Sequence, residues 1–185
     1  NRDTFKDDDH IRVHPIITKG GDLVNVVPAD VRLETYVRGA NVEAIVDAAK
    51  KVDRCLRAGA MAMGARVRIA TLSGYLPRLV CAPLVELYKR NAASLLGEDA
   101  WWEPSFGAGS TDLGDVSHLM PAIEAQAKGA CGTGHGADYA ICDPELAYIA
   151  PAKVAAMTLI DLLVDGAAKA HEIVSAYEPP MTKDG

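Results

Sequence analysis

Two segments near the start of the chain alternate between apolar and polar residues, which predicts a pair of half-buried strands. Residues 11–18 place His14 on the polar side, and residues 30–38 place Arg38 on the polar side. The sequence KGGD at 19–22 predicts a turn between these strands. Together, strand, turn and strand predict a β-hairpin.

A helical period follows the hairpin. Apolar residues recur every three or four positions between Val42 and Met63, Asn41 is a good N-cap and Gly64 can end the helix. Residues 65–72 alternate again and predict a third strand. The order β-β-α-β predicts a ferredoxin-like unit that lacks its first strand and helix, because a preceding β-α would be needed to complete a split βαβ sandwich.

The second half of the chain has an α/β character. Residues 74–83 predict a linker, and residues 83–96 predict a helix that Gly97 closes. Glycine-rich stretches flank two short predicted strands and precede two predicted helices. The glycine-rich stretches are 106–115 and 128–140, the strands 116–121 and 122–127, and the helices 151–165 and roughly 167–177.

Composition and charge favour a soluble folded protein and argue against some kinds of partner. The 185 residues are enough for one ordinary domain or two small ones, and 49% hydrophobic with 24% charged residues is normal for a soluble folded protein. A net charge of −6 argues against a nucleic-acid or anionic-membrane partner. The most apolar stretch, 154–164, is too short to span a bilayer and contains Asp161.

The cysteines give no sign of a disulfide scaffold or a zinc ribbon. None of the four forms a CxxC pair. We therefore expect buried thiols in a reducing, cytoplasmic setting.

Histidines are the first candidates for chemistry. His135 lies in GTGHG, and the flanking glycines would let a ligand approach its imidazole. It is either a metal ligand or a solvent-exposed loop residue, since no second ligand follows at zinc-motif spacing. His118, inside a predicted strand, is expected to be a satisfied core or edge residue, and His10 and His171 are expected at the surface.

The hairpin and one glycine-rich loop carry the other candidates. His14 and Arg38 form either a solvated sheet face or a site for a carboxylate or a developing oxyanion. Asn25 is either an amide donor to that site or a turn residue. Backbone N–H groups of the loop 106–115 could receive an anion, although the loop is neither a P-loop nor a nucleophile elbow.

Four stretches of the sequence together resemble a known family. They are VHPIITKGGDLVNVVPADVRLETYVRG, GSTDLGDVSHLMP, GTGHGADY and PAKVAAMTLIDLL, in this order. They resemble the aminoacylase-like, dinuclear-metal amidohydrolases and peptidases, nearest the p-aminobenzoyl-glutamate hydrolase branch, which includes dipeptidases. The resemblance implies that residues 1–73 are part of a lid and dimerisation domain. Residues 74–185 would then be the C-terminal part of the catalytic domain.

The resemblance also implies an activity and a homodimer. The expected reaction hydrolyses an amide of an N-acyl amino acid, an aminobenzoyl-glutamate-like compound or a dipeptide through metal-activated water. Two divalent ions, Zn or Mn, are expected, with one ligand, His135, from this chain. His14 would stabilise the oxyanion, in cis or across the dimer, and Asn25 and Arg38 would hold the substrate carboxylate. The substrate pocket would be lined by Gly109, Ser110, Thr111 and Asp112.

The remaining metal ligands and the general base of that family lie in an N-terminal portion, and no HxD motif occurs in this sequence. The resemblance therefore implies a C-terminal piece of such an enzyme, or a truncated relative, that is inactive alone. A non-catalytic dimerising or small-ligand-binding module is the main alternative. A regulatory ferredoxin-like domain with an unrelated tail is a third interpretation.

Overall fold

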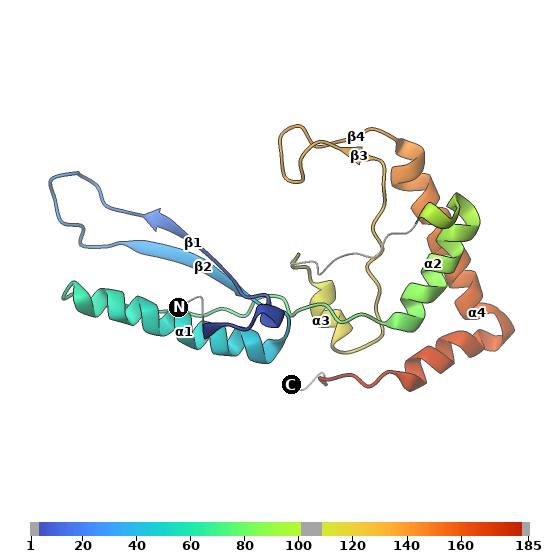
Figure 1. Ribbon diagram of the computed structural model, residues 1–185, viewed down its shortest axis with the longest axis horizontal. Coiled ribbons are helices and arrows are strands. Elements are labelled where there is room, and N and C mark those ends of the chain that lie inside the picture. Colours follow the sequence, from blue (N-terminus) through green and yellow to red (C-terminus); the bar gives the residue numbers. More distant parts are fainter. Residues whose placement is uncertain (1–3, 101–108, 183–185) are drawn as a thin grey trace. The chain divides into compact units, whose positions relative to one another are not determined.

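The structure, a computed structural model, describes residues 4–100 and 109–182 (Figure 1). It is a mixture of helices and small sheets, as the expected α/β class requires. The chain divides into an N-terminal and a C-terminal unit between Pro77 and Arg78. Each unit is described by itself.

The N-terminal unit contains the predicted hairpin. Strand β1 (Arg12–Lys19) pairs antiparallel with β2 (Arg32–Arg38), so the hairpin prediction is confirmed. The connection is a long loop, residues 20–31, rather than a tight Gly-Gly turn. Asp30 closes the base of this loop, because its carboxylate accepts from Lys19 Nζ at 3.2 Å and pairs with Arg32 at 3.0 Å. These two cations lower the pKa of Asp30, with the hydrogen bond from Arg32 as the larger cause.

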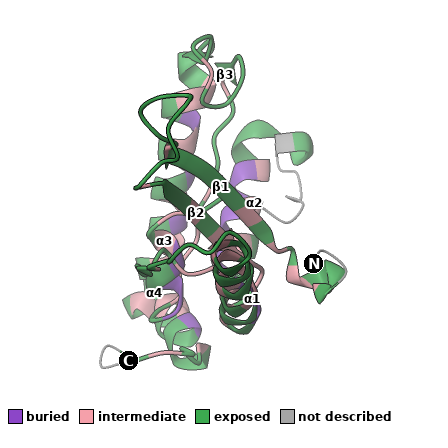
Figure 2. Ribbon diagram, turned by 90° about the vertical axis from the view of Figure 1, so that its left-hand side faces the viewer, coloured by how far each residue is buried: buried purple, intermediate pink, exposed green. Residues whose placement is uncertain are grey.

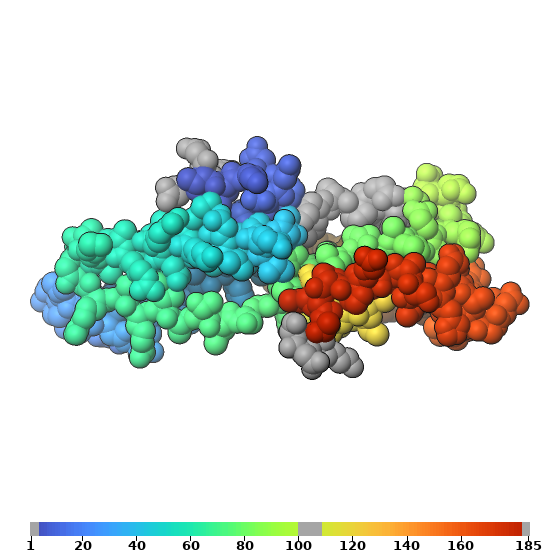
Figure 3. All heavy atoms as spheres, turned by 90° about the horizontal axis from the view of Figure 1, so that it is seen from below, coloured from blue at the N-terminus to red at the C-terminus, as the bar shows by residue number. Residues whose placement is uncertain are grey.

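Helix α1 (Val42–Ala62) begins and ends where the sequence predicts. The side chain of Asn41 accepts from the Ala44 backbone N–H at 2.8 Å, and Gly64 follows the helix with a left-handed φ of 64°. The helix lies beside the hairpin, and its side chains form one long surface of this unit (Figures 1 and 3). Gly39 permits the close approach between them, because a Cβ there would lie 2.8 Å from Ile11.

The prediction of a third strand at 65–72 is wrong for the described structure. After α1 the chain runs back alongside the helix (Figures 1 and 3), but it pairs with neither β1 nor β2. Alternation predicts which side of a strand is buried, whereas a strand also needs a neighbour for its backbone groups. In the ferredoxin-like order, that neighbour is the first strand, which the sequence analysis expects to be missing.

The C-terminal unit is a helical pair with small additions. Its elements are α2 (Ala82–Leu96), the 3-10 turn η3 (Glu98–Ala100), α3 (Leu113–Ser117), β3 (Ala130–Cys131), β4 (Ala140–Ile141), the π-helical turn η4 (Glu145–Ile149) and α4 (Ala150–Ala176). Gly97 follows α2 with a φ of 93°, as predicted for the end of that helix. Buried residues lie mainly on α2 and α4, whereas the hairpin of the other unit is largely exposed (Figure 2).

Two small apolar clusters hold α2 against α4. Tyr88 and Ala92 pack with Val154, which is 1% exposed. Cys81 and Leu84 pack with Ile173 from the end of α4. Burying such side chains contributes about 1.5–3 kcal/mol for each large residue, so this contact dominates the stability of the unit.

The two strands predicted at 116–121 and 122–127 are also wrong. The first segment is the end of α3 and a turn, because Ser117 Oγ donates to the Gly114 carbonyl at 2.7 Å and His118 Nδ1 lies 2.9 Å from the same oxygen. Such local side-chain bonds compete with strand formation. The second segment keeps its alternation, since Ile123 and Ala125 pack toward the clusters, but it has no strand partner among the described residues.

Helix α4 is two helices joined by a break. Val164 to Ala167 leave the helical conformation, and Asp165, Gly166 and Ala167 have φ values of 53°, 68° and 62°. This break separates the predicted helices 151–165 and 167–177. By length and composition alone, the stretch Glu145–Ala176 is apolar enough to cross a membrane. The break and Asp161 argue against a continuous span.

Many large apolar side chains are exposed to solvent. The chain exposes 13,761 Å². Two separate compact domains of the same total mass would expose about 10,000 Å². Val24 and Val27 on the hairpin loop are 109% and 89% exposed, and Leu159, Ile160 and Leu163 on α4 are each more than half exposed. Large exposed apolar areas are typical of surfaces that contact other protein, a ligand or a membrane.

Asn91 connects the two main helices and gives a test of this core. Its Nδ2 donates to Thr158 Oγ1 at 3.2 Å and to Asp161 Oδ2 at 2.9 Å. Asn91→Ala should lower the free energy of unfolding by roughly 1–3 kcal/mol, because both acceptors lose a donor. Urea unfolding measures this loss. The exposed Ser94→Ala on the same helix is the control and should change stability by less than about 0.5 kcal/mol. An equal effect of both changes would contradict the bridging role.

Candidate functional site

One face of the hairpin carries the predicted polar groups. The register pairs His14 with Tyr36 and Arg12 with Arg38, and residues directly opposite in an antiparallel pair share a face. His14 and Arg38 therefore lie on the same face, two residue positions apart along the strands. The register thus places both predicted residues on one sheet face, together with Arg12. The guanidinium carbon of Arg38 lies 5.3 Å from the centre of the Tyr36 ring, a cation–π contact that holds it across this face.

Asn25 lies far from this pair within one chain. It belongs to the loop 20–31, which joins β1 to β2 (Figure 1), whereas His14 lies near the start of β1 and Arg38 ends β2. The five positions from His14 to Lys19 alone span about 17 Å of strand. The described conformation therefore does not bring the amide of Asn25 to the carboxylate site proposed for Arg38.

The predicted pocket loop starts α3. Its residues 106–108 lie outside the described residues, and the division between the units runs through Gly109–Asp112. Thr111 Oγ1 donates to Asp112 Oδ1 at 3.0 Å. The backbone N–H groups of Gly114 and Asp115 donate back to Thr111 and Asp112. These two amides are used inside the helical turn and are not free to receive an anion.

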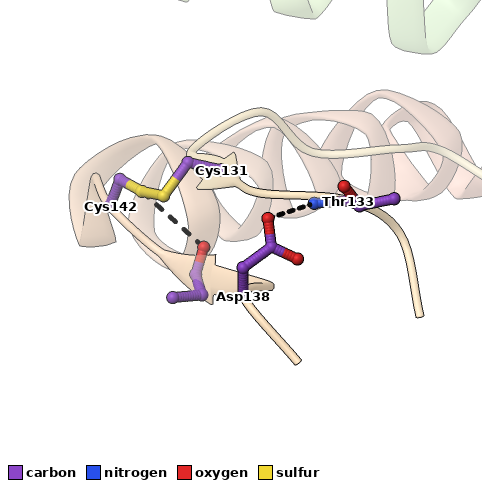
Figure 4. The surroundings of a disulfide bond; sticks show 5 residues. Cys131, Thr133, Asp138 and Cys142 are labelled. Carbon is purple, nitrogen blue, oxygen red and sulfur yellow. Dashed lines mark hydrogen bonds between the residues drawn. A yellow bond between two sulfur atoms is a disulfide. The ribbon is translucent and has the colours of Figure 1, made fainter. Parts of the chain in front are cut away.

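His135 lies in the loop between β3 and β4. Its side chain is exposed and its φ is +63°, a left-handed conformation that costs a non-glycine residue roughly 1–2 kcal/mol. The loop is braced around it. Gly136 N–H donates to the Thr133 carbonyl at 2.7 Å, and Thr133 N–H donates to Asp138 Oδ2 at 3.2 Å (Figure 4). A Cβ on Gly136 would lie 2.9 Å from the Thr133 carbonyl oxygen, so a larger residue there would force this turn to shift. Backbone strain of this kind is typical of functional sites.

The described residues do not fit a complete metal centre. Within 4–100 and 109–182, no group of three or more His, Cys, Asp or Glu side chains converges as a metal ion requires. His135 is thus a single candidate ligand. No catalytic step through a metal follows from the described side chains.

The cysteines differ from expectation. Cys131 and Cys142 form a disulfide across the base of the His135 loop (Figure 4), and Cys55 is exposed. Only Cys81 is a buried thiol, so the expectation of buried thiols holds for it alone. The spacing of the cysteines does not predict this disulfide, because eleven positions separate the two partners and no short motif contains both.

The remaining histidines are where the sequence predicts them. His118 is 5% exposed and satisfied by Gly114, although it follows a helix rather than lying in a strand. His10 and His171 are exposed.

Sequence reasoning missed a cavity of about 390 Å³ in the C-terminal unit. It lies beside α2 and the start of α4, where Tyr88 and Val154 contribute apolar wall and Arg78 pairs with Glu124. No motif marks it, because its residues come from four separate stretches of chain. Burial raises the pKa of the Tyr88 phenol.

Comparison with known proteins shows a distant relationship. No protein-family model matches the chain. An "Xaa-Arg dipeptidase" of Mus musculus is 34% identical over 118 residues, which are 60% of this chain and 27% of the relative. An "Xaa-Arg dipeptidase" of Homo sapiens is 31% identical over 163 residues, 82% of this chain and 37% of the relative. The chain spans about a third of the length of these relatives, and the likeness supports kinship with dipeptidases and amidohydrolases but no particular branch.

Proposed function

We propose that this chain is the lid and C-terminal catalytic segment of a dipeptidase-like amidohydrolase. The proposed substrate is a dipeptide with a free C-terminal carboxylate, and the relatives named Xaa-Arg dipeptidase favour a C-terminal arginine. The comparisons give no support to the aminobenzoyl-glutamate substrate. One observation carries the proposal: the exposed His14 and the half-buried Arg38 share a sheet face in a chain related to dipeptidases.

The two side chains suit different parts of such a substrate. A guanidinium offers a fork of donors that matches a carboxylate, and the stacking of Arg38 on Tyr36 fixes its direction. An imidazole beside it can donate to an oxygen that becomes negative as the amide is attacked. His14 is exposed, which suits a group that meets a ligand.

A second copy of the chain explains the position of Asn25. One hairpin holds Asn25 and Arg38 at opposite ends, so one carboxylate cannot reach both within a single chain. We assign Asn25 to a substrate site that it shares with His14 and Arg38 of a second subunit. The exposed apolar residues of the hairpin loop, Val24 and Val27, suit such a contact.

Metal dependence is part of the proposal. His135 would be one ligand of two divalent ions, zinc or manganese, whose chemistry in such hydrolases is to activate water. The described residues supply no further cluster of ligands. That shortfall favours the second candidate function, a non-catalytic module that dimerises or binds a small ligand. The uncovered apolar surface of α4 and the unpaired segment 65–72 favour the enzyme, because both need additional protein.

The first test concerns metal. His135→Gly removes the imidazole and also relieves the positive φ, so any loss of metal cannot be blamed on a strained loop. In the protein that carries this chain, the variant should lose about one metal equivalent and all hydrolysis of an Xaa-Arg dipeptide, with unchanged or slightly raised thermal stability. Metal content by elemental analysis checks this. The exposed His171→Gln is the control. Full metal content in His135→Gly would refute the ligand assignment.

The second test separates the two hairpin residues. Arg38→Ala should chiefly raise KM, because the carboxylate is present in ground and transition states alike. His14→Ala should lower kcat by roughly 10²- to 10³-fold, since the oxyanion exists only during attack. Stability should change by about 0.5 kcal/mol or less for the exposed His14. Steady-state kinetics gives both constants.

Arg12→Ala is the matched control, because Arg12 lies opposite Arg38 on the same face with the same charge. A specific carboxylate site predicts a much smaller effect on KM for Arg12→Ala. Equal increases in KM for Arg12→Ala and Arg38→Ala would mean that substrate binding depends only on the overall positive charge of this face. A His14→Ala enzyme with the wild-type kcat would end the catalytic interpretation.

A further inference from the structure

We propose that Cys131 and Cys142 form a reversible redox modification site that fixes the His135 loop when oxidised and releases it when reduced. Their Cα atoms are 6.0 Å apart, within the range that a disulfide bridges. Both residues are exposed, so small thiols and disulfides can reach them. They enclose residues 132–141, a loop that includes His135.

The crosslink matters because the bonds from Gly136 to Thr133 and from Thr133 to Asp138 lie within the loop, whereas few contacts tie its two ends together. The β3–β4 ladder has two residue pairs, Ala130 with Ile141 and Cys131 with Ala140. A two-stranded hairpin is marginal in water even when it is longer than this. Beyond it, the N–H groups of Cys142 and Asp143 donate to the Gly129 carbonyl at 2.8 and 3.0 Å. The disulfide is the one covalent tie across this loop.

Two glycines beside β3 allow the backbone segments on either side of the loop to lie close together. Gly129 and Gly132 have φ values of 98° and 86°. A Cβ at Gly129 would lie 2.7 Å from the Ala147 nitrogen, and one at Gly132 would lie 2.9 Å from the Tyr139 Cα. These glycines bring the two cysteine-bearing segments together, so the thiols remain neighbours after reduction.

The reaction is thiol–disulfide exchange with a small-molecule disulfide such as oxidised glutathione. One cysteine thiolate attacks that disulfide, forms a mixed disulfide and expels one small thiolate. The second cysteine thiolate then attacks the protein sulfur of the mixed disulfide, forms the Cys131–Cys142 bond and expels the other small thiolate. The two cysteines lose two electrons and two protons, and the small disulfide gains the electrons and becomes two thiols.

Burial keeps the Cys81 thiol from competing for the pair. Cys81 is buried in the cluster with Leu84 and Ile173. Cys55 lies on α1 in the N-terminal unit. The consequence for catalysis rests on the proposed function of His135: oxidation would hold its imidazole in the geometry needed by a ligand, and reduction would loosen it.

The experiment uses the full protein that carries this chain, equilibrated over a series of reduced-to-oxidised glutathione ratios. Alkylation of each cysteine is read by mass spectrometry, and hydrogen exchange is measured on the peptide 132–141. Cys131 and Cys142 should lose alkylation together and regain it when the ratio is reversed. Exchange of the loop amides should become roughly 10- to 100-fold faster on reduction.

Cys131→Ser and Cys142→Ser should each show the fast exchange at every ratio, and the remaining cysteine of the pair should stop at the mixed disulfide with glutathione, which mass spectrometry detects. Cys55→Ser is the control and should leave both readouts unchanged. The proposal is overturned if the two cysteines stay alkylatable under oxidising conditions, if they pair with other cysteines, or if loop exchange is the same in both states. None of these readouts needs activity, so failure of the redox site and failure of the proposed function are distinguishable.

Discussion

A β-strand is stable only when its backbone donors and acceptors meet a neighbour, and this requirement governs what the chain can form. In the hairpin β1–β2, each strand satisfies the backbone groups along one of its edges by pairing with the other strand. The pair β3–β4 adds two residue pairs. Residues 65–72 and 122–127 have the side-chain alternation of strands without a partner among the described residues. Helices need no such neighbour, and α1, α2 and the two parts of α4 are therefore the main elements of the described structure.

The same requirement explains how far the sequence predicts the structure. The ends of α1 and α2 follow from local chemistry, because Asn41, Gly64 and Gly97 act within one turn of the helix. Alternation places Ile123 and Ala125 correctly toward the core, but it contains no information about a partner strand. The disulfide between Cys131 and Cys142 was missed because it depends on how two glycine-rich turns bring the chain back on itself.

The sequence identifies which residues are candidates for the site, but it predicts only part of their arrangement in space. His14 and Arg38 share a face because the register of the hairpin pairs Arg12 with Arg38, as alternation predicts. Asn25 is separated from them because the connection is a long loop closed by Asp30, which a Gly-Gly signal does not reveal. The left-handed φ of His135 occurs in a loop braced by its own hydrogen bonds, such as the one from Thr133 N–H to Asp138, and no sequence motif marks them. The residues proposed for one reaction therefore lie on two separate units, and the hairpin residues are proposed to act in the site of a second copy.

Subunit exchange tests that central claim most directly. Inactive His14→Ala protein is mixed with inactive His135→Gly protein, exchange is confirmed with distinguishable tags, and dipeptide hydrolysis is measured. If His14 acts across the dimer, each heterodimer contains one complete site, and the mixture should recover up to about a quarter of the wild-type activity. Confirmed heterodimers with no activity above that of either parent would contradict the account.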